Sequence, residues 1–117
     1  MSHPTTPLPY DADIKAVPKT SGPINLLVHI TAKPGKEAEV KKYLQGVRDY
    51  ANSDKEPGTL VYNISQSNAG PETYIVYEIY KDEAAFHHHT DGATFKELFS
   101  KAGELVEVFH SRWYTEF

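Results

Sequence analysis

The sequence lacks cysteine altogether, and this absence excludes several kinds of chemistry. Without a thiol there is no cysteine nucleophile, no thiolate metal ligand and no disulfide bond. A chain without disulfides is compatible with a reducing compartment, and we expect a cytoplasmic protein. A long apolar run is also missing, so we expect no membrane-spanning helix. The first residues do not pair a basic segment with an apolar one, so we expect no secretory signal.

A strong excess of one charge is missing too. Twelve Lys and Arg face 16 Asp and Glu, which gives a net charge of −4. No basic stripe is present, so we expect no nucleic-acid partner. No glycine-rich dinucleotide or phosphate motif occurs either. What is abundant is aromatic: eight Tyr, five Phe and one Trp. Such side chains fill cores and also line pockets for flat organic ligands.

Proline is concentrated at the start of the chain, where residues 1–23 hold five of the eight prolines. Because proline lacks an N–H donor and fixes φ, we expect no regular structure there. We interpret 1–23 as an N-terminal arm and 24–117 as the folded domain. Terminal segments are often disordered. The apolar residues Tyr10, Ile14 and Val17 leave open an arm that packs across a partner subunit.

Hydrophobic periodicity over residues 24–117 predicts the order β-α-β-β-α-β, with the second helical region split. The expected elements are a strand at 24–32, a helix at 36–52, strands at 58–68 and 72–81, helices at 83–90 and 93–103, and a strand at 104–116. The turn residues at 68–71 predict a hairpin between the middle strands. This order is typical of the α+β ferredoxin-like fold, the split βαβ arrangement, with helices on one face of an antiparallel sheet.

Alternation within the strands predicts which side chains meet the helices. On the first strand the apolar face consists of Ile24, Leu26, Val28 and Ile30. On the third strand the residues expected against the helices are Ile75, Tyr77 and Ile79. The residues expected to face outward or into a cavity are Tyr74, Val76, Glu78 and Tyr80. The helices suffice for one sheet face, so we expect a second copy to cover the other in a two-fold homodimer.

The stretch from Tyr74 to Phe99 carries the most informative pattern. A strand containing Glu78 runs into a helix that begins at the predicted N-cap Asp82 and holds His89. The pieces Tyr77-Glu78-Ile79-Tyr80, Ala85-Phe86, His89 and Phe95-Lys96 resemble the signature of the antibiotic biosynthesis monooxygenase (ABM) domains, although Tyr80 stands where that family usually has Trp. Ala32-Lys33-Pro34-Gly35-Lys36 also resembles the family's turn after its first strand, and Glu56-Pro57-Gly58 followed by Tyr62 resembles its entry to the second strand. The resemblance covers about residues 24 to 116.

The resemblance implies a dimeric α/β barrel in which each subunit has a pocket between its sheet and its helices. It further implies a cofactor-independent monooxygenase that acts on a small aromatic or polycyclic phenolic, anthrone-like substrate. Such a reaction needs a base that deprotonates an activated C–H group and a donor that stabilises the resulting oxyanion. Oxygen then reacts with the electron-rich carbon. No cofactor is expected.

The candidate site residues follow from these needs. The candidate bases or proton relays are His89, Glu78 and His29. Candidate substrate-binding residues, as oxyanion donors or as aromatic walls, are Asn63, Arg112, Tyr80 and Trp113. Each of them also fits a purely structural role, such as a buried hydrogen bond, a surface ion pair or core packing. Helical neighbours are about 100° apart, so three successive histidines at 87–89 cannot converge on one ion, and we expect no metal site.

Three other functions fit the same scaffold. A proton-transfer enzyme, an isomerase or a decarboxylase, would use the same base and donor without oxygen. A non-catalytic ligand-binding dimer needs neither, because fold does not imply function. Haem binding would need an axial histidine, and Val28 occupies the place of the strand asparagine in the haem-degrading members of the family.

Overall fold

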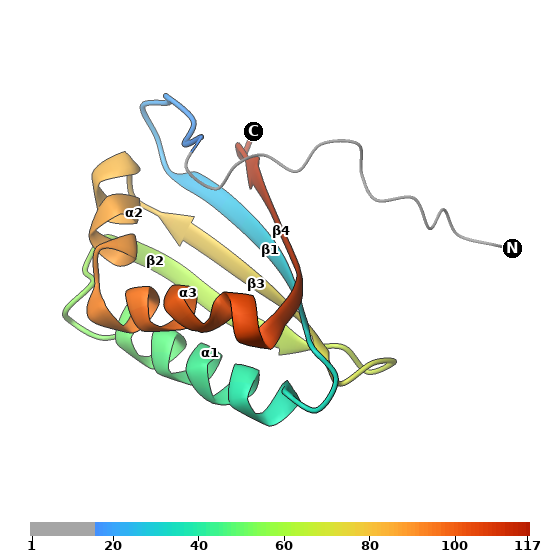
Figure 1. The fold of residues 1–117 in the computed structure, drawn as a ribbon. Coiled ribbons are helices and arrows are strands. Elements are labelled where there is room, and N and C mark those ends of the chain that lie inside the picture. The colour runs from blue at the N-terminus through green and yellow to red at the C-terminus, as the bar shows by residue number, and fades with distance from the viewer. Residues whose placement is uncertain (1–15) are drawn as a thin grey trace, which may run out of the picture.

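A computed structural model describes residues 16–117 of the chain. Its elements are β1 (Ile24–Ala32), α1 (Glu37–Ala51), β2 (Thr59–Gln66), β3 (Thr73–Tyr80), α2 (Glu83–Thr90), α3 (Ala93–Leu105) and β4 (Val106–Tyr114). The strands form one antiparallel sheet in the order β2-β3-β1-β4, and the helices lie on one of its faces (Figure 1). The predicted α+β ferredoxin-like fold is therefore confirmed.

Local sequence signals set most of the element ends. Gly35 has a φ of 80°, a left-handed conformation that favours glycine, and it turns the chain from β1 into α1. The Asp82 side chain accepts a hydrogen bond from the Ala85 N–H and caps α2, as predicted. The predicted end of α3 at Gly103 was wrong, because the helix continues to Leu105. Burial of Leu105 in the core outweighs the weak helix propensity of a single glycine.

The core lies between the sheet and the helices. From β1 it contains Ile24, Leu26, Val28 and Ile30, as predicted. From α1 it contains Val40, Leu44, Val47 and Ala51. Burial of these aliphatic side chains supplies the main driving force for folding, at about 25 cal/mol per Å² of apolar surface.

The predicted orientation of β3 was wrong. Its buried residues, on the helix side, are Tyr74, Val76, Glu78 and Tyr80, whereas Ile75 and Tyr77 are exposed on the other side. The register pairs Val28 with Val76 and Leu26 with Glu78, so these residues share the helix-facing side with the core of β1. Tyrosine can be buried when its hydroxyl finds a partner, and the Tyr74 hydroxyl donates to the Glu37 carbonyl oxygen at 3.2 Å.

Part of the predicted N-terminal arm packs on the domain itself. Val17 is buried within the core, and Lys19 Nζ lies 2.7 Å from a carboxylate oxygen of Glu83 at the start of α2. Tyr10 and Ile14 lie outside the described residues. No helix among residues 16–117 has the length and apolar content needed to cross a membrane.

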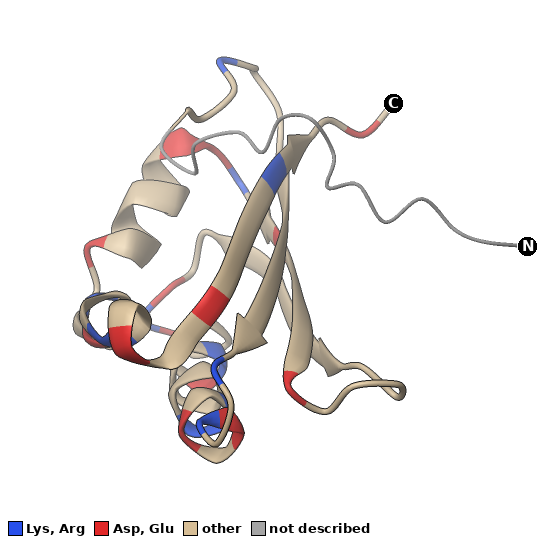
Figure 2. Cartoon of the chain, turned by 45° about the vertical axis from the view of Figure 1, so that its right-hand side comes forward, with Lys and Arg blue, Asp and Glu red and all other residues tan. Residues whose placement is uncertain are grey.

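The face of the sheet opposite the helices is largely free of charge. Charged residues gather on the helices and loops, while most of each strand lacks them (Figure 2). Ile75, Tyr77 and Tyr114 on this face are 39%, 42% and 45% exposed. We call this surface, formed by the outward residues of all four strands, the open sheet face.

Candidate functional site

Helix α2 directs one histidine into the protein and two into solvent. Phe86 and His89 are its buried residues, three positions apart and therefore on one side of the helix, whereas His87 and His88 are exposed. The His89 side chain is 1% exposed. Its ring lies 5.3 Å from the Tyr62 ring, 5.5 Å from the Tyr80 ring and 5.3 Å from the Phe95 ring, measured between centroids. An aromatic cage thus surrounds this imidazole.

The two ring nitrogens of His89 have different surroundings. Nδ1 lies 2.7 Å from Oε1 of Glu56, whose side chain is also 1% exposed. Nε2 is buried and has no hydrogen-bond partner among the described residues. Buried polar atoms are normally satisfied, and an exception needs an explanation. A ligand that exchanges a proton with Nε2 would supply one.

Glu56 belongs to the turn that precedes β2. Its Oε1 also accepts a hydrogen bond of 2.9 Å from the Thr59 hydroxyl. Burial pushes the pKa of Glu56 upward, but the hydrogen bonds from His89 and Thr59 and the charge of His89 outweigh it, so the pKa lies below its ordinary value. Glu56 is therefore ionised at neutral pH.

A second carboxyl group, that of Glu78, lies in the same region. It is buried on β3 and accepts a short hydrogen bond from the Tyr80 hydroxyl. Burial raises the pKa of Glu78 to about 7, helped by the charge of Glu56 and opposed by His89 and by the Tyr80 hydrogen bond. Burial and the charge of Glu78 also raise the pKa of Tyr80, which stays protonated. Glu56 and Glu78 thus differ in protonation near neutral pH.

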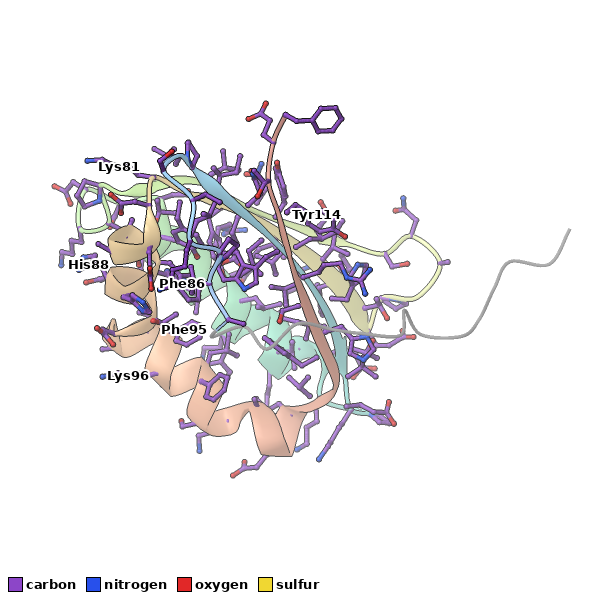
Figure 3. All side chains as sticks on the ribbon, turned by 90° about the horizontal axis from the view of Figure 1, so that it is seen from above. Lys81, Phe86, His88, Phe95, Lys96 and Tyr114 are labelled. Carbon is purple, nitrogen blue, oxygen red and sulfur yellow. The ribbon has the colours of Figure 1, made fainter. Side chains whose placement is uncertain are left out.

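An apolar groove of about 510 Å³ lies over α2 and α3 beside this cluster. Its aromatic lining residues are Phe86, Phe95 and Phe99. Phe86 and Phe95 lie on the sides of α2 and α3 that face the sheet, whereas Lys96 points away (Figure 3). The Phe95 ring contacts both the Phe99 ring and His89, so Phe95 separates the groove from the imidazole.

Trp113 of β4 contacts the same group of rings, and we call Tyr62, Tyr80, Phe86, His89, Phe95 and Trp113 together the aromatic cluster. The Trp113 ring meets the Phe86 ring edge-on, with centroids 4.9 Å apart. The indole Nε1 is buried and lacks an acceptor among the described residues. Within residues 16–117, Nε2 of His89 and Nε1 of Trp113 are therefore both buried without a hydrogen-bond partner.

The sheet divides the predicted site residues into two groups. His89, Glu78, Tyr80 and Trp113 lie on the helix side. The remaining three, on the open sheet face, are His29, Asn63 and Arg112. Alternation separates them, because each neighbours a residue that points to the helices. A base at His89 and a donor at Asn63 or Arg112 therefore do not meet within one subunit.

Glu56 was not predicted as a site residue. The sequence Glu56-Pro57-Gly58 was interpreted only as the entry to the second strand, and the contact of Glu56 with His89 spans 33 residues of sequence. The only signal available in the sequence was a carboxylate beside a turn. Among residues 16–117, no three or more histidine or carboxylate side chains gather in a way that could hold a metal ion.

Comparison with known proteins agrees with this architecture. The profile of the antibiotic biosynthesis monooxygenase family matches residues 23–101. YcnE of Bacillus subtilis (strain 168), a monooxygenase by provisional assignment, is 29% identical over 85 residues, which cover 73% of this chain and 87% of YcnE.

Solved structures share the fold. The crystal structure of PA3566 from Pseudomonas aeruginosa superposes with a TM-score of 0.77 at 22% identity, covering 83% of this chain and 96% of that one. Protein SO0527 from Shewanella oneidensis gives a TM-score of 0.75 at 24% identity, covering 83% and 93%. Because the family profile spans most of the folded part of the chain, this protein belongs to the antibiotic biosynthesis monooxygenase family.

Proposed function

We propose that the protein is a cofactor-independent monooxygenase that acts on a small aromatic substrate of the anthrone or polycyclic phenol type. One observation carries this proposal: the buried His89, whose Nε2 has no partner among the described residues, contacts Phe95, which lines the aromatic groove. A flat apolar ligand suits the groove, and a base is what activation of its C–H group requires.

The reaction can proceed without a redox cofactor because the substrate supplies the electrons. His89 Nε2 removes a proton from a benzylic CH₂ group, and the carbanion is delocalised as an enolate. Transfer of one electron to O₂ and recombination of the radical pair form a C–O bond. The peroxide anion takes back the proton from His89, and loss of water leaves a ketone. The sum is R₂CH₂ + O₂ → R₂C=O + H₂O.

Other residues of the cluster serve this chemistry in distinct ways. We assign the donor to the developing enolate oxygen to the Trp113 N–H, a buried donor that has no acceptor among the described residues. Phe86 and Phe95 provide aromatic walls, and Phe95 must move for a ligand in the groove to reach His89. Glu78, bonded to Tyr80, holds or releases a proton near neutral pH.

Oxygen uptake by chelator-treated protein tests the proposal, with a panel of anthrones and dihydroxyaromatics as substrates. We expect uptake to survive chelation and to fall by about 10² to 10⁴ in His89→Gln, the usual contribution of a general base. His88→Gln is the matched control, since that ring lies on the exposed side of the same helix. Full uptake in His89→Gln together with loss in His29→Gln would overturn the assignment of the base.

The same assay separates the proton-transfer alternative. An isomerase or decarboxylase would turn over its substrate equally well without oxygen. Product formation under nitrogen that is abolished in His89→Gln would therefore transfer the residue roles to that reaction and refute the oxygenase.

We also propose that a second copy of the chain covers the open sheet face. The support is its exposed Ile75, Tyr77 and Tyr114, since large apolar patches on a single chain mark interfaces. Sedimentation should then give twice the chain mass of 13.2 kDa. Tyr77→Glu should shift it to one copy while keeping the circular dichroism spectrum. A wild-type protein that sediments as one copy at micromolar concentration would refute the homodimer.

A further inference from the structure

We propose that Glu56 is the positioning residue of this site: its carboxylate holds the Nδ1–H of His89 and thereby makes Nε2 the atom that exchanges a proton with the ligand. The inference rests on the proposed function only in assuming that His89 meets a ligand. The tautomer it assigns to His89 holds whatever the reaction is.

The chemistry of the pair selects the tautomer. An ionised carboxylate can only accept hydrogen bonds, so at 2.7 Å from Glu56 Oε1 the Nδ1 atom must carry hydrogen. A neutral imidazole then has its lone pair on Nε2. Nε2 is the nitrogen that has no partner, so within residues 16–117 the lone pair is directed at no other polar group.

The turn holds Glu56 firmly against α2. The Glu56 N–H donates to the Ser53 carbonyl oxygen at 3.3 Å, and the Thr59 N–H donates to the Glu56 carbonyl oxygen at 3.1 Å. The Thr59 hydroxyl fixes Oε1 itself. Gly58 approaches α2 so closely that a Cβ atom on it would overlap the Ala85 methyl group. These contacts leave Glu56 and His89 little freedom to change their relative geometry.

A purely stabilising role is a poor explanation for the pair. The Glu56 carboxylate and the His89 imidazole are both 1% exposed and lose most of their hydration, and a buried charge with its partner is often no more stable than apolar residues of the same volume. The same helix carries a contrasting pair, His87 and Glu83, at 3.1 Å but exposed to solvent. Burial, and not the pairing alone, sets Glu56 and His89 apart.

Side chains from every neighbouring element face His89, but only Glu56 bonds to it. They are Tyr62 of β2, Glu78 and Tyr80 of β3, and Phe95 of α3. The Glu78 carboxyl is bonded to Tyr80 instead. Glu56 is thus the one described group positioned to choose which nitrogen of His89 carries the proton.

Nitrogen-15 NMR of the histidine side chains in the full chain tests the assignment at pH 8. In the wild type, His89 should show a protonated Nδ1 and a bare Nε2. In Glu56→Ala it should show a mixture of both tautomers. In Glu56→Gln it should keep the wild-type tautomer, because Thr59 holds the amide oxygen toward His89. Glu83→Gln, the matched exposed control, should leave the His89 signals unchanged.

Steady-state kinetics supplies the second readout. We expect kcat to fall about 100-fold in Glu56→Ala, as for a misplaced catalytic group, with KM changed less than about twofold. Glu56→Gln should recover part of this loss. If Glu56→Ala does not fold, Glu56→Gln and the wild-type tautomer still decide.

Two results would overturn the proposal: a wild-type His89 protonated at Nε2, or an unchanged single tautomer in Glu56→Ala. The predicted tautomer pattern in a protein that takes up no oxygen would support the role of Glu56 and refute the oxygenase. The two failures are therefore distinguishable.

Discussion

Replacing Glu78 by Gln should change the pH dependence of folding stability more than any other single substitution at the site. Burial raises the pKa of Glu78 from the ordinary value of 4.5 to about 7. The folded state therefore binds this proton more tightly than the unfolded chain does. The contribution of Glu78 to the wild-type free energy of unfolding should therefore be complete below pH 4.5. It should decrease as the pH rises toward 7 and should be constant above that pH.

The size of the effect follows from the same values. The interval between 4.5 and about 7 corresponds to about 3 kcal/mol, at ~1.4 kcal/mol per pH unit. The side chain is 4% exposed, so solvent screens it little. Gln has nearly the same shape and keeps an oxygen that can accept the Tyr80 hydroxyl, but it does not titrate. The free energy of unfolding of Glu78→Gln, measured relative to that of the wild type, should therefore increase by about 3 kcal/mol between pH 4.5 and pH 8.

Urea unfolding at several pH values between 4.5 and 8 measures this difference. The slope m should be equal for both proteins, so that the midpoints report stability alone. Glu83→Gln, an exposed glutamate, should follow the wild-type curve. A constant difference between Glu78→Gln and wild type across the pH range would refute the reasoning, because it would mean that Glu78 titrates alike in the folded and unfolded states.

The remaining predictions concern the packing contacts and the helix cap that hold α2 and the segment before β1 in place. The Gly58→Ala variant should lose about 1–3 kcal/mol of its free energy of unfolding, because the new methyl group overlaps that of Ala85. Adding Ala85→Gly should restore part of this loss. Additive effects in the double variant would contradict the contact. Asp82→Ala should cost about 1 kcal/mol in chemical denaturation by removing the α2 cap, whereas Asp82→Asn should cost less. The Val17→Ala variant should lose about 1 kcal/mol of its free energy of unfolding, and limited proteolysis should cut it faster before residue 24. An unchanged cleavage rate would mean that Val17 does not anchor the segment that precedes β1.

The fold could be predicted because its signals are local. Pro34-Gly35 marks the turn before α1, Asp82 marks the start of α2, and Asp91-Gly92 separates α2 from α3. The orientation of β3 could not be predicted in this way. One face of β3 carries Glu78 and the other is wholly apolar or aromatic, so alternation favours the wrong face, and only the register with β1 decides which face is covered.

The site could be predicted only in part, for the same reason. The predicted site residues His89, Glu78, Tyr80 and Trp113 lie on one side of the sheet, and their roles stay predictions. Glu56, the partner of His89, was not predicted, because a contact between residues 56 and 89 depends on how a turn and a helix pack. Their packing requires a glycine at 58, and the reason for that glycine appears only when α2 is in place.

The separation of two surfaces by one sheet has a consequence for redesign. Along β4, Arg112 belongs to the open sheet face and Trp113 to the aromatic cluster, so we expect substitutions at alternate positions to change either the proposed association or the proposed ligand binding. The groove can therefore be reshaped at Phe86, Phe95 and Trp113 without touching the surface proposed to join two copies. Inserting a single residue into β4 would have a different effect from these substitutions. It would exchange every inward and outward side chain beyond it, and both surfaces would be lost in one step.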